Sequence, residues 1–264
     1  MAAVSQGLVD FANHFRQPAA PGMEVIETPR YTITLQPDFP IPGPNSVAWV
    51  RCGASEAEAV VRVVRAVLTA RRLPLMWILD PETQPADLGD RLAAMGIMPD
   101  AHAPEVAVMV LPSEAELDTP AVPGLQIQDA LADPELFRQA DLVNTEAFDE
   151  PARDPGPQER RRQNQLAAGN RRALLATLDG EPAGSAGMTL YPPGGAIING
   201  GAVRPRFRGR GVYRALVAER LRQAREAGLP GLSVWGGPMS APILERLGFS
   251  KVGWRRFYLD RSTP

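Results

Sequence analysis

The chain has 264 residues, of which 44% are hydrophobic and 22% charged, and its formal net charge is −2 at pH 7. This composition is that of an ordinary folded protein with room for one large or two small domains, and the charge gives no field that would hold a nucleic acid or a membrane surface. Cys52 is the only cysteine, which excludes an intrachain disulfide, and no apolar run approaches the ~20 residues of a membrane span. We therefore expect a cytoplasmic protein, a monomer or a homodimer, without a nucleic-acid or membrane partner.

The N-terminal half alternates strand and helix patterns. Residues 1–20 carry a weak helical pattern that stops at Pro18, so this segment is expected to be a helix or an arm. Residues 23–35 alternate with the period of a strand, and Ser55-Glu56 has the signals of a helix start. The other elements expected here are strands at 47–52, 75–79 and 106–111, a helix from Ser55 that ends before Pro74, and a helix at 85–95.

The C-terminal half follows a Pro-, Glu- and Thr-containing linker at 112–124. Asp133-Pro134-Glu135 combines an N-cap, a first-position proline and a first-turn acid, so a helix is expected to start there. Asp179-Gly180 between two apolar runs predicts a tight hairpin. The remaining expected elements are a strand at 125–128, a basic helix from Pro157, strands at 196–203 and 232–235, helices at 212–227 and 240–247, and a last strand.

The motif Arg-x-x-Gly-x-Gly, residues 206–211, lies between the expected strand 196–203 and the expected helix 212–227. Gly209 and Gly211 allow a tight loop whose amides approach a ligand, and the helix start adds unpaired N–H groups and a positive dipole end. Arginines oppose that dipole, and a bound anion would relieve the conflict. A pyrophosphate site is therefore expected. The loop lacks the lysine of a P-loop, and Arg214 occupies the third glycine position of a dinucleotide-binding fingerprint.

Val203-Arg204-Pro205 directly before this motif, and Leu247-Gly248-Phe249 before the last strand, make the segment resemble the GCN5-related N-acetyltransferases. The resemblance covers roughly residues 122–264 and implies acetyl-CoA as the cosubstrate. The first half repeats the order of elements without the glycine loop, and Glu56 and Glu58 stand where a phosphate would bind. The chain is then similar to the tandem members of the family, although any two halves of this class can share such an order.

The expected fold is α/β (α+β), with two acetyltransferase-like domains, each a mixed, largely antiparallel central sheet flanked by helices. The boundaries are an N-terminal helix or arm at 1–20, a degenerate copy at 21–111, a linker at 112–124 and an acetyl-CoA-binding domain at 125–264.

The resemblance also implies which residues bind acetyl-CoA. Backbone groups of the central strand would hold the pantetheine arm, and amides of the loop and helix start would hold the pyrophosphate. The residues implied are Gly201, Ala202, Val203, Arg208, Gly209, Arg210, Gly211, Val212, Tyr213 and Ser240.

The catalytic groups are less defined, because Leu244 stands where family members often carry a tyrosine acid and Gly237 where they often carry an asparagine. Ser240 is a candidate for contacting the sulfur, or it is a plain N-cap. The candidates for binding or deprotonating an amine are Glu146, Asp149 and Glu150, which alternatively form a solvated helix end. The histidines, His14 and His102, have no partner at metal-ligand spacing, so no metal is expected.

These features favour an N-acetyltransferase that acts on a primary amine of a small molecule, peptide or protein by direct transfer in a ternary complex. Two alternatives remain: a CoA-binding sensor or scaffold without turnover, and a transferase that uses another acyl donor.

Overall fold

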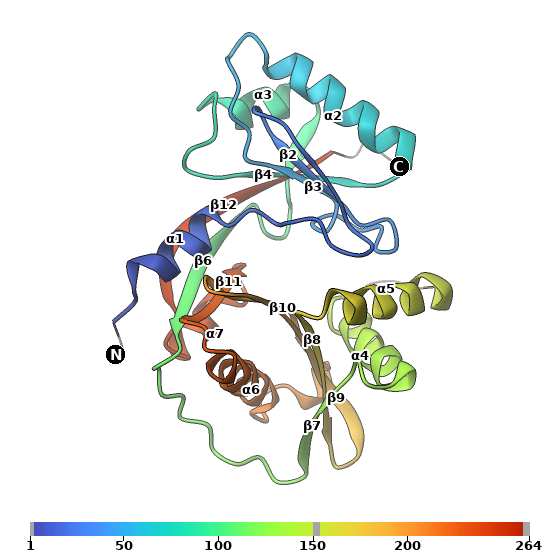
Figure 1. The fold of residues 1–264 in the computed structure, drawn as a ribbon, viewed down its shortest axis with the longest axis vertical. Coiled ribbons are helices and arrows are strands. Elements are labelled where there is room, and N and C mark those ends of the chain that lie inside the picture. The colour runs from blue at the N-terminus through green and yellow to red at the C-terminus, as the bar shows by residue number, and fades with distance from the viewer. Residues whose placement is uncertain (1–2, 150–153, 261–264) are drawn as a thin grey trace. The chain divides into compact units, whose positions relative to one another are not determined.

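The computed structural model describes residues 3–149 and 154–260 (Figure 1). Its contacts divide the chain into two compact units. Unit 1 contains Met109–Val234, Pro242–Val252 and the N-terminal segment up to Phe15; unit 2 contains Arg16–Val108, Trp235–Ala241 and the segment from Gly253 onward. No helix of the described residues is both long and apolar enough to cross a membrane.

Unit 2 is built on a sheet with two helices packed against it. Antiparallel pairs join β1 (Glu24–Glu27) to β2 (Thr32–Leu35) and β2 to β3 (Ser46–Ala48), and β3 runs parallel to β4 (Leu75–Leu79). The end of β12 (Ser250–Asp260) then pairs antiparallel with both β4 and β5 (Ile97–Pro99). The helices are α2 (Ala57–Arg71) and α3 (Leu88–Ala94), and β6 (Glu105–Pro112) runs on into unit 1.

The core of unit 2 follows from the spacing of apolar residues on α2. Val60, Val64 and Leu68 recur every four residues, so they lie on one helix face, and all are buried. That face packs on inward side chains of the sheet such as Trp77, in a cluster that also holds Leu88 and Leu92 of α3. Both helices therefore cover the same face of the sheet.

Residues 23–35 form a hairpin in place of the single strand expected from their alternation. The turn follows Thr28, whose hydroxyl oxygen accepts from the amides of Arg30 and Tyr31 at 3.2 and 3.0 Å and whose amide donates to the Tyr31 carbonyl at 3.0 Å. Threonine and proline in this turn break the strand, although the period of two continues on both sides.

Unit 1 has a sheet in the order β11-β10-β9-β8-β7. Its strands are β7 (Leu125–Asp129), β8 (Arg171–Leu178), β9 (Glu181–Tyr191), β10 (Gly195–Val203) and β11 (Gly231–Gly236). Its helices are α1 (Gln6–His14), α4 (Pro134–Ala147), α5 (Pro155–Ala168), α6 (Val212–Glu226) and α7 (Ala241–Arg246), with a 3-10 turn at Pro205–Phe207. The strands pair antiparallel except β10 and β11, which are parallel.

Helices cover both faces of the unit 1 sheet, as Figure 1 shows for α4 and α6. Leu175 and Ala202 pack with Ala140 and Val143 of α4. The neighbouring Leu174 and Ala176 of β8 pack with Val212 and Leu216 of α6. Successive strand residues thus serve opposite faces, and each unit has the mixed sheet flanked by helices that the sequence predicts.

The hairpin between β8 and β9 turns at Asp179-Gly180, as predicted. Both residues have positive φ, +53° and +82°. Two central residues in the left-handed region define the turn whose twist matches the flanking strands, and Asp-Gly is among the pairs that adopt it most easily.

The division into units differs from the predicted boundaries at both ends of the chain. The first residues form the ordered helix α1, capped by Ser5, and its buried Leu8 belongs to unit 1. At the other end, Tyr258 and Asp260 pair with Trp77 and Leu75 of β4, so the last strand finishes in unit 2.

An ion pair fixes the end of β12 in unit 2 and gives a test of this arrangement. Nε of Arg65 lies 2.6 Å from a carboxylate oxygen of Asp260, whose side chain is fully buried. Replacing Arg65 with Leu removes this ion pair from a buried carboxylate, and we expect the free energy of unfolding to fall by about 3–5 kcal/mol. Arg71→Leu breaks the exposed pair with Glu24 and is expected to cost at most about 1 kcal/mol. Urea unfolding of both variants measures the difference, and equal losses would contradict the role given to Asp260.

Candidate functional site

Strands β10 and β11 pair only at the start of β10. Their register covers Ala196 with Leu232 and Ile197 with Ser233, whereas β10 stays paired with β9 as far as Val203. Beyond Ile197, one edge of β10 is therefore not bonded to β11. Peptide groups on such an edge are ready to pair with an extended ligand.

A β-bulge lies on this part of β10. The register with β9 shifts between Asn199 and Ala202, and Gly200 between them has φ +56°. Asn199 and Gly200 are exposed, whereas the other residues of β10 are buried or half-buried. A bulge redirects side chains and frees backbone groups, and bulges are frequent beside active sites.

The glycine loop follows β10 and leads into α6. Gly209 and Gly211 have φ +77° and +83°, which explains the need for glycine at both positions. Gly211 is the N-cap residue of α6, and no side chain caps the helix there. A Cβ added at Gly209 would meet no atom within 4 Å. The loop thus offers uncapped amides and open space, which fit a phosphate group.

Carboxylates lie beside the arginines of this loop. Arg206 pairs with Glu181 at 2.8 Å, and Arg210 with Asp179 at 3.6 Å. Each of these side chains is at least half exposed, so each pair contributes about 0–1 kcal/mol and gives way easily to a phosphate. The conflict between arginines and helix dipole is therefore already reduced by the β8–β9 turn, which the sequence argument did not foresee.

The structure gives the two described acidic candidates different surroundings. A carboxylate oxygen of Glu146 lies 2.9 Å from Nε of Arg204, whose side chain is 14% exposed. Asp149 is exposed and has φ +54°. Both residues are exposed, and Glu146 has a cation of its own chain as a partner; Glu150 lies outside the described residues.

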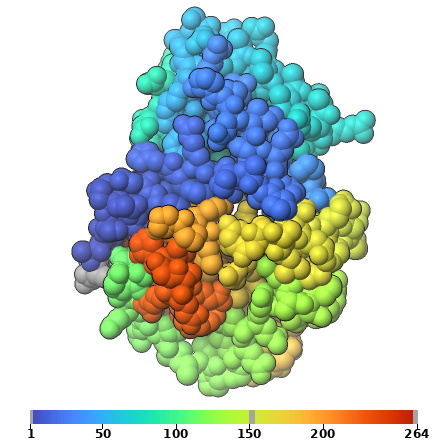
Figure 2. All heavy atoms as spheres, viewed as in Figure 1, coloured from blue at the N-terminus to red at the C-terminus, as the bar shows by residue number. Residues whose placement is uncertain are grey.

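Ser240 and Leu244 lie at the start and in the middle of the α7 region. Ser240 belongs to unit 2, and its hydroxyl donates to the Gly237 carbonyl at 3.4 Å. Leu244 belongs to unit 1 and is fully buried, although α7 itself lies at the surface in Figure 2 (orange-red). The position of the expected tyrosine is thus a core position, where an apolar residue packs without an unpaired hydroxyl.

The fully buried Arg220 of α6 is a polar residue that the sequence analysis missed. Its Nε donates to the Leu216 carbonyl at 3.0 Å and one terminal nitrogen donates to the Gly187 carbonyl at 3.4 Å, while Nη2 has no hydrogen-bond partner among the described residues. Burial lowers the pKa of Arg220 to about 10, so the group remains charged at neutral pH. A signal was present: Leu216, Arg220 and Ala224 recur every four residues on the apolar stripe of α6.

Tyr213 lies beside Arg220 and the bulge. A Cβ added at Gly201 would be 3.0 Å from Cε2 of Tyr213 and 3.5 Å from Nη2 of Arg220. Burial raises the pKa of the Tyr213 phenol, and the Arg220 guanidinium counteracts that rise. Because Gly201 has no side chain, the Tyr213 ring and the Arg220 guanidinium both lie close to β10 at this residue.

Unit 2 has no comparable open loop before α2. The amide of Gly53 donates to a carboxylate oxygen of Glu56 at 2.9 Å, and Arg30 lies 3.3 Å from the other oxygen of this carboxylate. Glu56 thus already supplies an anion to the loop amide and repels a phosphate. The sequence pattern of Glu56 after a single glycine thus corresponds to this hydrogen bond between the Gly53 amide and the Glu56 carboxylate.

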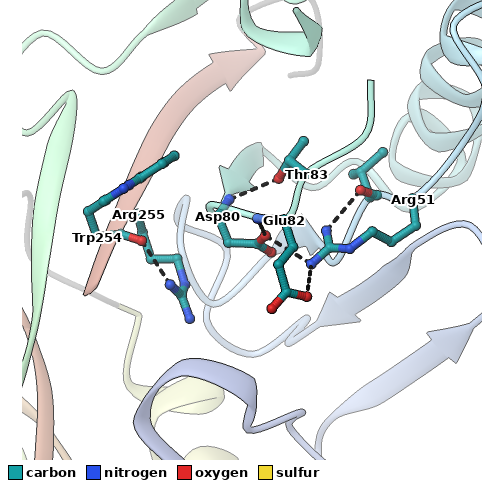
Figure 3. A network of polar contacts seen from close by, with 7 residues as sticks. Arg51, Asp80, Glu82, Thr83, Trp254 and Arg255 are labelled. Atoms are coloured by element: carbon teal, nitrogen blue, oxygen red, sulfur yellow. Dashed lines mark hydrogen bonds and ion pairs between the residues drawn. The ribbon is translucent and has the colours of Figure 1, made fainter. Parts of the chain in front are cut away.

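A network of polar contacts in unit 2 is centred on Arg51 and Asp80 (Figure 3). Arg51 donates to the buried Asp80 at 2.9 Å and to Glu82 at 3.3 Å, and the amide of Asp80 donates to the Thr83 hydroxyl at 2.9 Å. Arg255 donates to the carbonyl of Trp254 at 2.8 Å. Among the described residues, no group of three or more His, Cys, Asp or Glu side chains is placed to hold a metal ion.

Comparison with known proteins agrees with this geometry. Residues 139–249 match the model of the Acetyltransferase (GNAT) family. A search of curated protein sequences finds no match. Beyond this matched segment, similarity to solved structures extends the fold over most of the chain.

Three solved structures illustrate this similarity in fold. A GCN5-related N-acetyltransferase from Kribbella flavida is 19% identical, with 97% of this chain and 92% of that chain covered and a TM-score of 0.65. One from Sphaerobacter thermophilus is 17% identical, covers 89% and 81%, and has a TM-score of 0.63. A tandem GNAT protein from the clavulanic acid biosynthesis pathway is 17% identical, covers 93% and 85%, and has a TM-score of 0.57.

The glycine loop can be tested with a control of equal backbone strain. Gly209 and Gly228 both have positive φ, +77° and +67°, and a Cβ at either meets no atom within 4 Å. Gly209→Ala and Gly228→Ala are therefore expected to cost similar stability, about 1–2 kcal/mol. Only the first places a methyl group beside the loop amides, and we expect it to weaken CoA binding at least tenfold in calorimetry. Equal affinities in both variants would mean that the phosphates bind elsewhere.

Proposed function

We propose that the protein is an acetyl-CoA-dependent N-acetyltransferase that acts on a primary amine of a small molecule, peptide or protein. The observation that carries the proposal is the combination of the unpaired edge of β10 after Ile197 with the uncapped glycine loop before α6. One feature suits an extended amide-containing arm and the other a pyrophosphate. CoA contains both groups in one molecule.

The residues present fit this cosubstrate. Gly201, Ala202 and Val203 would bind the pantetheine arm through their backbone, and the amides from Gly209 to Tyr213 would bind the pyrophosphate. The Arg208 amide, which the sequence also assigned to the pyrophosphate, already donates to the Pro205 carbonyl at 3.2 Å. Acetyl-CoA supplies an acyl group on a thioester, and the chain supplies orientation. Positioning two reactants accounts for a large part of the rate in such transfers.

Direct transfer from the thioester to the amine is the mechanism we favour. Cys52 is the only cysteine of the chain, and burial and the neighbouring Glu56 raise the pKa of its thiol. A thiol that stays protonated is a weak nucleophile. An acyl-enzyme on Cys52 is therefore disfavoured, and the amine would attack the thioester while both are bound. A backbone amide of β10, such as that of Val203, would stabilise the carbonyl oxygen as charge develops.

A CoA-binding protein without turnover is the second candidate. The buried Leu244 favours it, because no phenol can reach the sulfur from that position. A CoA thiol is acidic enough to leave without a strong acid, however, so turnover does not require a phenol at this position.

Stoichiometry and turnover together test the proposal. Because the Gly53 amide is occupied by Glu56, we expect calorimetry to give one CoA site per chain. Two equivalent sites would contradict the degenerate first copy. Release of CoA thiol from acetyl-CoA should rise with at least one member of a panel of primary amines. Binding without release over the whole panel would favour the second candidate.

The acidic residues near the end of α4 are proposed to attract the amine. Asp149→Asn is expected to lower kcat/KM for a cationic amine about tenfold, corresponding to ~1.4 kcal/mol, if its carboxylate binds the ammonium group. Glu146→Gln should lower it as well, although less, because Arg204 shares this carboxylate. The control is Glu181→Gln, which breaks an exposed pair with Arg206 and should leave kcat/KM within twofold. Unchanged kcat/KM in both test variants would indicate that these acids only form a solvated helix end.

A further inference from the structure

Trp49 follows β3 in a backbone conformation that is unusual for a bulky residue. Its φ is +58°, in the left-handed region, which glycine adopts without strain. In unit 1, the residue with this conformation beyond the paired part of the parallel strand is Gly200, with φ +56°. A strained residue persists only where the surrounding structure holds it, and such residues are frequent at ligand sites. The indole at this position is therefore the starting point for a search for a ligand site in unit 2.

Three arginines of unit 2 gather around this indole. The guanidinium carbons of Arg16, Arg51 and Arg255 lie 5.3, 5.6 and 5.9 Å from the centre of the Trp49 ring. Each contact has the distance of a cation–π interaction, but the three like charges also repel one another. Burial lowers the pKa of Arg255, and the positive charge of Arg51 contributes to this lowering. A negative charge at this place would relieve the repulsion.

Two carboxylates of the chain balance part of the positive charge. A terminal nitrogen of Arg51 lies 2.9 Å from Asp80 and 3.3 Å from Glu82, and both acids counteract the lowering of the Arg255 pKa. Figure 3 shows these carboxylates between the guanidinium groups of Arg51 and Arg255. Among the described residues, no carboxylate forms an ion pair with Arg16. Trp49, the three arginines and the two acids form what we call the Trp49 cluster, which has a surplus of one positive charge.

The acids of the Trp49 cluster are held in place by a turn that is bonded to the neighbouring strand segment. The Asp80 carboxylate accepts from the Glu82 amide at 2.8 Å, and the Gln84 amide donates to the Val50 carbonyl at 3.0 Å. Gln84 thus pairs with the chain directly after Trp49, so an extended arm could not bind there as proposed for β10. The cluster is a different kind of site, and its charges are ordered before any ligand binds.

The Trp49 cluster extends from a buried floor to an exposed rim. Arg255 is 3% exposed and Asp80 is 6% exposed, whereas Arg16 is exposed. Trp235, whose ring lies 5.7 Å from the Arg255 guanidinium, is 44% exposed and packs on Phe257 at 5.9 Å. The rim therefore offers a positive charge and an exposed aromatic surface next to the buried charges.

We propose that unit 2 binds the carboxylate of a small organic acid at the Trp49 cluster, with the apolar body of the acid on the indole of Trp235. Arginine guanidinium groups are suited to bind carboxylates, and the surplus of one positive charge matches a single carboxylate. A phosphate monoester carries roughly −1.5 to −2 at neutral pH and would leave a negative charge over. The site shares no residue with the glycine loop of unit 1, and the inference does not depend on acetyl transfer.

Benzoate is the probe for the first test, because it combines one carboxylate with a flat apolar body. In heteronuclear NMR of the full chain, benzoate should shift the indole N–H signals of Trp49 and Trp235 in a saturable manner. The signals of Trp77, in the core, and Trp254, which stacks on Arg256, should not move. Unmoved signals of both Trp49 and Trp235 would overturn the proposal.

Two further probes separate charge from shape. Benzyl alcohol has the ring of benzoate without the charge and should bind at least tenfold more weakly, the loss expected for one hydrogen bond to a charged group. Inorganic phosphate should also bind more weakly than benzoate. Equal affinity for benzyl alcohol would overturn the role of the arginines, and tighter binding of phosphate would overturn the choice of a carboxylate.

Neighbouring arginines of β12 give a matched pair of variants. Arg255→Gln should lower the affinity for benzoate about tenfold. Arg256→Gln removes the same charge one residue further along, where the side chain pairs with Glu105 at 3.1 Å, and should leave the affinity within twofold. Arg16→Gln changes an exposed residue and should lower the affinity at least threefold, so it keeps the test valid if Arg255→Gln does not fold. Equal effects of the Arg16 and Arg256 variants would overturn the proposal.

Trp49→Gly tests whether the strained residue serves the site. Glycine adopts φ +58° without strain, so the backbone should keep its course while the surface that gathers the guanidinium groups is lost. The affinity for benzoate, followed at the Trp235 signal, should fall about tenfold, and an unmoved Trp77 signal would confirm that the core is intact. Wild-type affinity in this variant would contradict the role given to Trp49.

Discussion

The early end of the pairing between β10 and β11 is the constraint on which the rest of unit 1 depends. Two parallel strands that stayed bonded over their whole length would satisfy each other's peptide groups and leave nothing for a ligand. Here the register ends at Ile197 with Ser233, and the bulge at Gly200 turns the following residues away from the regular ladder. Unpaired peptide groups cost free energy, and here they occur on the strand that leads directly into the glycine loop. The binding edge and the phosphate loop are consecutive in sequence, so a single local distortion positions both.

A bulge also creates a defect on the other side of the strand, and Arg220 is placed at that defect. Its guanidinium donates to the Gly187 carbonyl and lies behind Gly201. A neutral donor would have satisfied a carbonyl at a lower desolvation cost. The phenol of Tyr213 is a further neighbour of this guanidinium.

The sequence predicts most of the elements of this site, and its limits have physical causes. Asp179-Gly180 defines its turn because few other residues tolerate two consecutive positive φ values. Gly209 and Gly211 predict the loop for the same reason. Arg220 escaped notice because arginine is assigned to solvent by default, although its spacing from Leu216 and Ala224 places it on the buried stripe. The sharing of β12 between units was also missed. Pairing of Asp260 with Leu75 joins residues far apart in the sequence, and local patterns carry no information about such a partner.

The contrast between the two units shows how a single carboxylate closes a phosphate site. Both α2 and α6 follow a strand and a glycine-containing loop, so both present unpaired amides and a positive dipole end. In unit 2, Glu56 accepts from the Gly53 amide and is itself paired with Arg30, which leaves that loop with an anion of its own. In unit 1, the N-cap position is Gly211, which has no side chain to accept from the helix amides, and the nearby acids bind the arginine side chains instead. The acids of unit 1 therefore neutralise cations around the loop and leave its amides open. A carboxylate thus occupies the loop of unit 2, whereas the carboxylates of unit 1 pair with arginines and leave the loop amides available.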